Sequence, residues 1–274
     1  MYDLTISIVI FFDKGYGNVE DLIKCLESVL STKLKIKVII LDNSSKKLEL
    51  DLFKDKRIEY IFVGKNIGFG RAHNIAIRKV IKKSKYHLVL NPDVFFKDDV
   101  LYELKNYMDK NKNVKAVTPK ILYPDGKTQF VCKLLPTPVD LILRRFIPIK
   151  SYLEMRNHIY ELRFTSYKKE MKIPVISGCF MFLRNDVLEK TKGFDERFFL
   201  YLEDVDLCRR ILKFGDIVFY PKVSVFHRFE KGSYKKFKLL IIHIISAIKY
   251  FNKWGWFIDK ERNEINKKFL KMLL

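Results

Sequence analysis

The sequence predicts an α/β fold in which a mostly parallel central sheet is covered by helices on both faces. Between residue 4 and about residue 121, strand-like apolar runs alternate with helix-like amphipathic stretches. The apolar runs are almost continuous, as expected for strands that are buried on both faces of a parallel sheet. A chain of 274 residues is long enough for one such core and an appendage.

The elements of this first part follow one another as strand, helix, strand, which a parallel sheet requires. In the first expected helix, Val19, Leu22, Leu26 and Val29 recur at helical spacing. Strands are expected at residues 4–12, 35–43, 58–64, 86–93 and 114–122, and helices at residues 18–32, 70–84 and 98–111.

The composition is that of a folded protein with an excess of positive charge. Hydrophobic residues make up 48% of the chain, and 53 Lys and Arg against 32 Asp and Glu give a formal net charge of +21. This excess favours an acidic partner, which can be nucleotide phosphates, an anionic membrane surface or nucleic acid. Lys residues on solvated helix faces would explain part of it, so charge alone does not choose among these partners.

Polar residues stand at or just after the ends of three of the expected strands, where a hydrophobic core does not need them. Each set alone would suit an ordinary turn. Parallel sheets bind ligands beyond the carboxyl ends of their strands, so the common position of the three sets predicts a binding site on that rim. The residues are Asp42 and Asn43, then Asn66 and Gly68, and then Asn91 and Asp93 with Pro92 between them.

Residues 122–172 interrupt the alternation of strands and helices. The segment contains several prolines and has no core pattern of its own, so we expect a partly helical excursion rather than a second domain. The sheet resumes at residues 173–185, and two short strands are expected at residues 216–220 and 221–229.

A helix is expected to end at Gly215, with Val205 and Cys208 on its buried face. Glu203 and Asp204 then fall in its first turn, where carboxylates complement the helix dipole. A sharper interpretation makes this pair the source of a general base, because a carboxylate that is kept ionised can accept a proton from an attacking sugar hydroxyl.

The tail, residues 231–274, is predicted to be helical, basic and amphipathic. Ten Lys or Arg stand against three acidic residues from residue 232 onward, and the apolar run before Lys249 is too short to span a bilayer. Two interpretations remain open. The tail docks on anionic lipid through basic residues and Trp254 and Trp256, or it forms a helical hairpin that packs on the core, and the two are compatible.

The cysteines and the N-terminus favour a cytoplasmic protein. The four cysteines are far apart and show no CxxC spacing, which is typical of buried free thiols in a reducing compartment. The first residues, MYDLTISIVIFF, lack the basic region and the cleavage site of a signal peptide and suit a core strand.

Asp93 is suited to hold a divalent cation against a diphosphate, because it follows Pro92 directly at the end of a strand. Hard oxygen ligands suit Mg²⁺ or Mn²⁺, and substrate phosphates can complete the coordination shell. His227, at the end of a late strand, is either a packing residue or a further ligand. If it is a ligand, Mn²⁺ becomes the better match.

Five stretches of the chain together form a recognisable series: LDNSS, NIGFGRAHNIAI, LNPDV, SGCFMFLRNDVLEKTKGFDERFFLYLEDVDLCRRI and VFH. In this order and at this spacing they resemble the family 2 glycosyltransferases of the GT-A fold, in particular the bacterial rhamnosyltransferase-like members. The resemblance covers roughly residues 5–230, and GFDERFFLYLEDVDLCRR is its most specific part. Residues 247–266 resemble the C-terminal helices of the same group.

The resemblance implies a GT-A, Rossmann-like catalytic domain over residues 1–230 and a C-terminal helical extension over residues 231–274. Within the domain, residues 1–121 would be the nucleotide-binding half, residues 122–172 an acceptor-side excursion, and residues 173–230 the half that carries the acceptor site and the base. The nucleotide-sugar would be contacted by seven residues: Asp42, Asn43, Asn66, Gly68, Arg71, Asn91 and Asp93.

For the reaction itself, the resemblance implies an inverting, metal-dependent transfer. Asp93 matches the metal-binding last Asp of the family's DxD motif, His227 matches a further metal ligand, and Asp204, beside Glu203, matches the catalytic base. Asn91 stands where a strict DxD motif has its first Asp. Residues 11–13, Phe-Phe-Asp, stand where the family often has Thr-Tyr-Asn.

We therefore expect a peripheral enzyme at the cytoplasmic face of the membrane. It would transfer a sugar, with L-rhamnose from dTDP-rhamnose as the first candidate, to a lipid-linked intermediate of a bacterial cell-envelope polysaccharide such as an O-antigen. A UDP-hexose-dependent enzyme of the same fold is the alternative. From other classes, a nucleotidyltransferase would not need Glu203 and Asp204, and a nucleic-acid-binding protein would carry a basic and aromatic motif that this sequence lacks.

Overall fold

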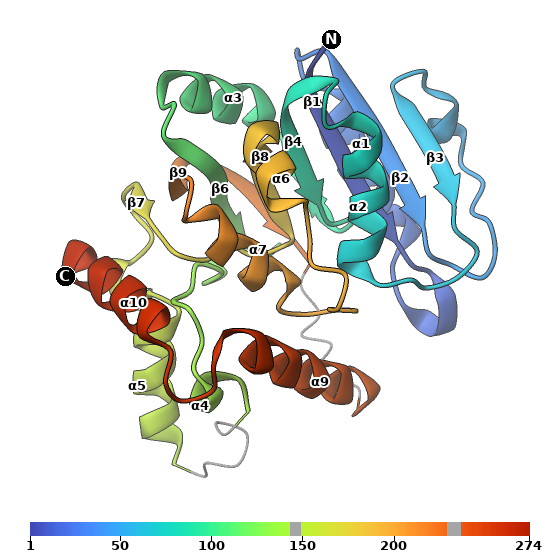
Figure 1. The fold of residues 1–274 in the computed structure, drawn as a ribbon. Helices are drawn as coiled ribbons and strands as arrows, with labels where there is room; N and C mark the ends of the chain where they lie inside the picture. Colours follow the sequence, from blue (N-terminus) through green and yellow to red (C-terminus); the bar gives the residue numbers. More distant parts are fainter. Residues whose placement is uncertain (143–148, 229–236) are drawn as a thin grey trace.

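The computed structural model describes residues 1–142, 149–228 and 237–274. Within them, a nine-stranded sheet has the order β3-β2-β1-β4-β8-β6-β9-β5, with β7 paired to β9 (Figure 1). The strands are β1 (Tyr2–Ile10), β2 (Ile36–Asp42), β3 (Ile58–Phe62), β4 (Ser84–Leu90), β5 (Val94–Phe95), β6 (Val114–Leu122), β7 (Met171–Lys172), β8 (Phe180–Arg184) and β9 (Asp216–His227).

Helices cover both faces of the sheet. The α-helices are α1 (Val19–Leu30), α2 (Phe69–Val80), α3 (Val100–Lys110), α4 (Pro138–Leu141), α5 (Lys150–Tyr160), α6 (Asn185–Thr191), α7 (Glu203–Ile211), α9 (Phe237–Trp254) and α10 (Lys260–Leu273). Short 3-10 helices lie at Asp13–Gly15, Asp51–Lys54 and Arg163–Thr165.

Alternation along β2 explains why both of its faces are covered. Val38 and Ile40 pack into the core under α1 and α3, whereas Ile39 and Leu41 pack against Ala72 of α2 on the other face. All of these side chains are buried, which confirms the prediction of a sheet covered on both faces.

The four strands β3, β2, β1 and β4 are parallel, as the alternation with helices predicts. The other half of the sheet is mixed, because β8 runs antiparallel to both β4 and β6, and β5 and β7 run antiparallel to β9. Among the described strands, only β6 and β9 add another parallel pair. After β6 the regular alternation of one strand with one helix is interrupted by residues 122–172, and β8 then enters the sheet in the opposite direction.

The two short strands expected at residues 216–220 and 221–229 form one strand instead. Over its described residues β9 runs from Asp216 to His227 with a shift of register, because Pro119 pairs with Tyr220 while Lys120 pairs with Ser224. Pro221 has no N–H to donate to the ladder, and a bulge absorbs it without ending the strand. Residue 229 lies outside the described residues.

A buried row of polar side chains ties α2 to the sheet. The Ser7 hydroxyl lies 2.7 Å from Nδ1 of His73 and 2.9 Å from Nε2 of His87, whose Nδ1 lies 2.9 Å from the Thr5 hydroxyl. Burial lowers the pKa of His87 to about 3, so this ring is neutral. The His73 ring also contacts the ring of Phe69, with centroids 4.3 Å apart, which helps to fix the start of α2.

The excursion packs into the same core as the later strands of the sheet. Tyr160, Leu162 and Tyr167 share one buried cluster with strand β8 and helix α7. Residues 143–148 of the excursion and residues 231–236 of the predicted tail lie outside the described residues.

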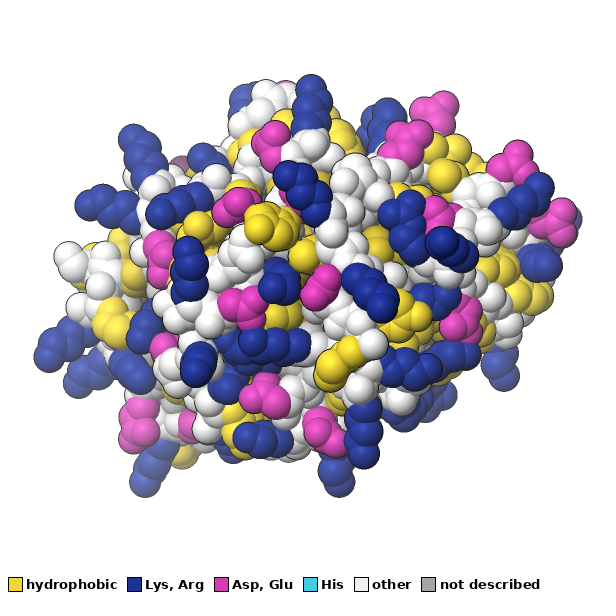
Figure 2. Space-filling view, turned by 90° about the horizontal axis from the view of Figure 1, so that it is seen from above, with side chains coloured by type: hydrophobic (Ala, Val, Ile, Leu, Met, Phe, Trp, Pro, Cys, Tyr) yellow, Lys and Arg dark blue, Asp and Glu magenta, His cyan; other side chains and the backbone are white. Residues whose placement is uncertain are grey.

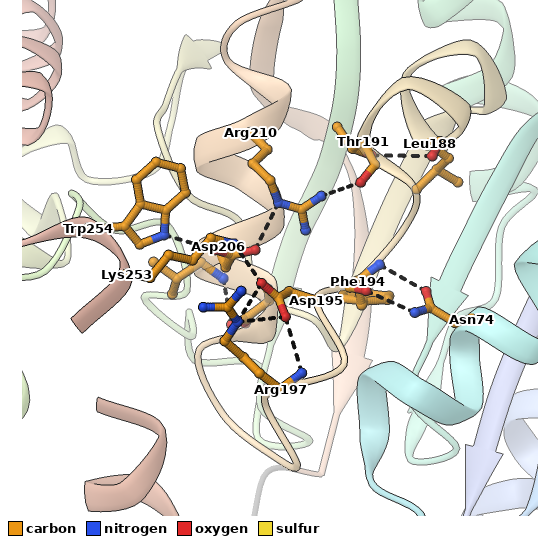
Figure 3. Close-up of polar contacts among 12 residues, drawn as sticks. Asn74, Leu188, Thr191, Phe194, Asp195, Arg197, Asp206, Arg210, Lys253 and Trp254 are labelled. Atoms are coloured by element: carbon orange, nitrogen blue, oxygen red, sulfur yellow. Dashed lines mark hydrogen bonds and ion pairs between the residues drawn. The ribbon is translucent and has the colours of Figure 1, made fainter. Parts of the chain in front are cut away.

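The C-terminal helices pack on the core, as one of the two interpretations of the tail predicts. The guanidinium of Arg209 on α7 pairs with both oxygens of Asp259, at 2.6 and 2.7 Å, and lies over the Trp254 ring. The buried Asp206 accepts hydrogen bonds from Arg210, Lys253 and the Trp254 indole (Figure 3).

Replacing Arg209 by Ala is expected to lower the free energy of unfolding by about 3–5 kcal/mol, because it leaves the Asp259 carboxylate buried without its partner. Urea denaturation measures the change. Lys54→Ala is the matched control, since it removes an ion pair with Asp51 that is almost fully exposed and should change little. A similar loss in both variants would contradict the docking of the tail through Arg209.

Candidate functional site

A cleft of about 330 Å³ opens at the carboxyl ends of β1, β2 and β4. Five of the residues that the sequence predicts for the nucleotide-sugar line it: Asn43, Asn66, Gly68, Asn91 and Asp93. The opposite wall comes from Phe199, Leu200 and Leu239. The cleft therefore lies on the predicted rim of the sheet, between the first half of the chain and its later segments.

Asn43 lines the cleft and has an unused, buried acceptor. Its side-chain amide donates to the Gly68 carbonyl at 3.3 Å, while its Oδ1 has no hydrogen-bond partner among the described residues. A buried acceptor without a partner costs free energy, so this oxygen is suited to receive a donor group from a ligand.

Asp42 is fully engaged within the protein and does not line the cleft. Its buried carboxylate accepts hydrogen bonds from the Ser44 N–H at 2.8 Å and from the Tyr60 hydroxyl. A direct contact of Asp42 with a nucleotide would require Tyr60 to release it. In this geometry Asp42 shapes the turn that carries Asn43.

The loop before α2 approaches Phe199 so closely that it requires a glycine. Gly68 has a φ of 92°, and a Cβ there would stand 2.5 Å from the Phe199 carbonyl oxygen. The Asn66 side chain accepts the Gly68 N–H at 3.0 Å, and the Phe69 N–H donates to the Phe199 carbonyl at 2.9 Å. These contacts fix the cleft wall on both sides of the loop.

Arg71 lies outside the cleft. Its Nε is 3.2 Å from Oε2 of Glu196, which also pairs with Arg78. Asn74, one turn further along α2, donates to the Phe194 carbonyl and accepts the Phe194 N–H (Figure 3). Arg71, which the sequence predicts to contact the nucleotide-sugar, therefore anchors the loop before α7 together with Asn74.

The turn Asn91-Pro92-Asp93 is held by its main chain, which leaves its side chains to the cleft. The Asn91 N–H donates to the Cys179 carbonyl at 2.9 Å, and the Asp93 carbonyl accepts the Arg228 N–H at 3.2 Å. The Asp93 side chain keeps 27% of its surface exposed.

His227 lies beside Asp93, as the order of motifs predicts. Its Nε2 is 3.4 Å from Oδ2 of Asp93, and its Nδ1 is 3.0 Å from Oε1 of Gln129. The Gln129 amide in turn donates to the His227 carbonyl at 2.6 Å. Burial alone would lower the pKa of His227, but Cys179 and Asp93 outweigh it and raise the pKa to about 10. Gln129 thus fixes the ring so that Nε2 faces Asp93.

Asp21 and Arg228 form a second charged pair in the cleft. Arg228 Nε lies 3.4 Å from Oδ1 of Asp21, and both residues line the cavity. Burial raises the pKa of Asp21, Arg228 opposes that shift, and Asp93 adds to it. Within the described residues no three His, Cys, Asp or Glu side chains converge as a ready-made metal site.

Glu203 and Asp204 begin α7 after a strained turn. Tyr201 and Leu202 both have left-handed φ values, of 72° and 66°, which side chains other than glycine rarely adopt. Asp204 accepts the Gly178 N–H at 3.0 Å and the Val205 N–H at 2.8 Å. It does not line the cleft itself.

Gly178 separates Asp204 from the cleft wall. A Cβ at Gly178 would stand 3.5 Å from the Asp204 Cβ and 3.4 Å from the ring of Phe69, which lines the cleft. Glu203 is buried, and its burial together with the neighbouring Asp204 raises its pKa to about 8. Glu203 is therefore protonated at neutral pH.

Sequence reasoning missed four residues of this site: Gln129, Asp21, Arg228 and Cys179. Asp21 has the pattern of an ordinary first-turn acid, and Gln129 lies in a segment without periodicity, so neither gave a signal. Arg228 follows His227 directly, and its position next to a candidate ligand was the signal that was available. All four cysteines are buried and free, as predicted.

A model of the family described as glycosyl transferase family 2 matches residues 8–192, which is more than half of the chain. The chain belongs to glycosyl transferase family 2. The match contains the LDNSS, NIGFG and LNPDV stretches, so the resemblance stated from the sequence is confirmed at the level of the family.

This family 2 glycosyltransferase is similar to several curated rhamnosyltransferases. It is 27% identical to Rhamnosyltransferase WbbL of Escherichia coli (strain K12) over 221 residues, which cover 78% of this chain and 79% of the relative. It is 25% identical over 220 residues to the N-acetylglucosaminyl-diphospho-decaprenol L-rhamnosyltransferase of Mycobacterium tuberculosis (strain CDC 1551 / Oshkosh), covering 72% of this chain and 68% of the relative.

Solved structures confirm the GT-A fold. GalNAc-T7 with UDP, GalNAc and Mn²⁺ matches with a TM-score of 0.58 and 12% identity, over 82% of this chain and 44% of that one. S. aureus TarS matches with a TM-score of 0.57 and 13% identity, over 98% of this chain and 43% of that one. The chain thus spans less than half the length of either structure.

Glu203→Gln is expected to stabilise the protein more at pH 8 than at pH 5. The pKa of Glu203 is raised in the folded state, so its stabilising contribution is complete below about pH 4.5 and is lost as the pH rises toward 8. The amide does not ionise, so the free energy of unfolding of the variant, relative to that of the wild type, grows by up to about 1.4 kcal/mol per pH unit in that window. Urea denaturation at both pH values measures it, and an equal difference at the two would contradict the burial of an ionisable Glu203.

Proposed function

We propose that this glycosyltransferase moves a sugar from a nucleotide-sugar to a hydroxyl of a lipid-linked glycan, with inversion at the anomeric carbon. One observation carries the proposal: the cleft joins an unused acceptor on Asn43 to the paired Asp93 and His227, and Asp204 lies just behind its wall. Asn43 would then contact the nucleotide, Asp93 and His227 would lie beside the diphosphate, and Asp204 would lie near the acceptor hydroxyl.

Asn43 and Asn66 would orient the nucleotide in the first half of the cleft. The Asn43 Oδ1 can accept a hydrogen bond from a base or ribose, and Gly68 lets the loop that carries Asn66 pack closely against Phe199. Asp42 and Arg71 would act indirectly, through the turn and the helix that they hold.

Asp93 and His227 would hold a divalent cation, Mn²⁺ or Mg²⁺, which neutralises the charge that develops on the departing diphosphate. One carboxylate and one imidazole fit a cation that takes its other ligands from the diphosphate. Binding through Nε2 requires His227 to lose its proton. Solved neighbours of the fold, GalNAc-T7 and a mannosyltransferase from Pyrobaculum calidifontis, are described as complexes with Mn²⁺.

Asp204 would accept the proton of the attacking hydroxyl. The N–H groups of Gly178 and Val205 hold its carboxylate in place, and the protonated Glu203 adds no competing charge. Attack from the Asp204 side, opposite the diphosphate at Asp93, would invert the anomeric carbon.

The names of relatives support the choice of donor and acceptor. The relative from Shigella flexneri is called a dTDP-rhamnosyl transferase, and the mycobacterial relative acts on a diphospho-decaprenol. We therefore propose dTDP-rhamnose as donor and a polyprenyl-linked intermediate of a cell-envelope polysaccharide as acceptor, at the cytoplasmic face of the membrane. Within the described residues, no helix has the length and apolar character to cross a bilayer.

On one face of the molecule the charged side chains are of mixed sign. Figure 2 shows the face at the top of Figure 1, where Lys and Arg side chains are spread among Asp and Glu, so the described residues of this face form no separate basic patch for nucleic acid.

A screen of dTDP-, UDP- and GDP-sugars by thermal shift with Mn²⁺ tests the proposed function. Stabilisation by dTDP-rhamnose alone supports the proposed function. Stabilisation by a UDP-sugar instead would make that sugar the donor, and no stabilisation by any of the sugars contradicts the proposal.

Asp204→Asn is expected to reduce sugar transfer by about 10²–10⁴-fold while leaving the affinity for the donor nearly unchanged, because the amide cannot accept a proton. Release of nucleoside diphosphate measures transfer, and calorimetric titration measures donor binding. Glu203→Gln is the matched control and should retain most of the activity. Substantial turnover by Asp204→Asn would remove Asp204 from the role of base.

Gln129→Leu is expected to raise the dissociation constant for Mn²⁺ by about 10–100-fold, because His227 loses the group that orients it. Asp93→Ala should weaken the binding of Mn²⁺ at least as much. Electron paramagnetic resonance of free Mn²⁺ in the presence of dTDP measures both without reference to catalysis. An unchanged Mn²⁺ titration in Asp93→Ala would contradict the metal assignment.

A further inference from the structure

Helix α9 has one face in the core and an apolar stripe on the outside. Its buried face contains Ala247, Tyr250 and Phe251. On the opposite side four apolar side chains recur at intervals of four, four and three residues, so they share one face of the helix. They are Phe237, Ile241, Ile245 and Ile248, with 77%, 42%, 45% and 39% of their surface exposed, and are called the α9 stripe below.

The charged side chains of helix α9 itself are all positive. Residues 237–254 contain three Lys and no Asp or Glu. Lys238 and Lys249 follow Phe237 and Ile248 directly, so they lie along one edge of the stripe and are exposed. An apolar stripe with Lys at its edge is typical of a helix that lies in the plane of an anionic membrane surface.

The same helix forms part of the cleft. Leu239 lines the cavity beside Phe199 and Leu200, and the Ser246 hydroxyl donates to the Leu200 carbonyl at 2.8 Å. Figure 1 shows α9 along the lower edge of the molecule, across the segment that leads into α7. A surface that covers the α9 stripe would therefore lie next to the mouth of the cleft.

We propose that the α9 stripe rests on the anionic surface of a lipid bilayer and thereby holds the cleft at the level of the headgroups. The aliphatic side chains would enter the boundary between headgroups and acyl chains, while Lys238 and Lys249 meet anionic headgroups. This orientation rests on the proposed function for the identity of the acceptor, whose glycan would then reach the cleft from the membrane side.

Sedimentation with vesicles tests the docking. The wild-type protein is expected to bind vesicles that contain phosphatidylglycerol, more weakly as salt rises, and to bind pure phosphatidylcholine vesicles poorly. The double variant Ile241→Glu/Ile245→Glu should bind the anionic vesicles about tenfold more weakly or worse, because it sets two carboxylates against the headgroups. Tyr102→Glu is the matched control, since Tyr102 on α3 is 40% exposed on a helix far from α9, and should bind like wild type.

Three results would overturn the proposal. They are a wild-type protein that does not sediment with anionic vesicles, a double variant that sediments as well as wild type, and a dimer in light scattering that the double variant loses. The last would make the stripe an interface between copies of this chain. Both variants must keep the wild-type melting temperature for the comparison to count.

The test separates this inference from the proposed function. Release of nucleoside diphosphate with a water-soluble acceptor should be equal in wild type and the double variant, because the stripe lies outside the cleft. Vesicle binding without any turnover of nucleotide-sugars would refute the proposed function and leave the docking intact. Turnover without vesicle binding would refute the docking alone.

Discussion

The contact between the start of α2 and the main chain of Phe199 joins the two halves of the cleft. The Phe69 N–H donates to the Phe199 carbonyl, and only a glycine at residue 68 leaves room for that carbonyl. Phe199 lies four residues before Glu203, at the entry to the left-handed turn of Tyr201 and Leu202. A single close backbone contact therefore sets both the cleft wall at Gly68 and the place where α7 begins, and with it the position of Asp204.

The loop that makes this contact is also held from the outside. Asn74 on α2 binds both main-chain polar groups of Phe194, and Lys253 on α9 bridges Asp195 of the loop and Asp206 of α7, at 2.7 and 2.5 Å (Figure 3). The C-terminal helices thus help to hold the loop that borders the cleft. If α9 meets the membrane, as inferred above, the same helix would connect the membrane surface to the loop that borders the cleft.

Much of the fold was predictable from the sequence because it rests on local periodicity. The parallel half of the sheet, the helices α1, α2, α3 and α7 and the pairing of Asp93 with His227 follow from strand ends and motif order. The antiparallel entry of β8 was not predictable, since its partners are distant in sequence and no periodicity encodes direction.

Which of two adjacent polar residues lines the cleft also depends on tertiary neighbours. The Tyr60 hydroxyl binds the Asp42 carboxylate, so that Asn43 lines the cleft and Asp42 does not. Arg71 pairs with Glu196 outside the cleft. Gln129 gave no local signal at all.

A crystal structure of the protein with dTDP and Mn²⁺ tests the central claim most directly. The account predicts an anomalous manganese peak within bonding distance of the Asp93 carboxylate and Nε2 of His227, with the diphosphate as its remaining ligand and the nucleotide beside Asn43. A nucleotide bound away from this cleft, or manganese bound without Asp93, would contradict it.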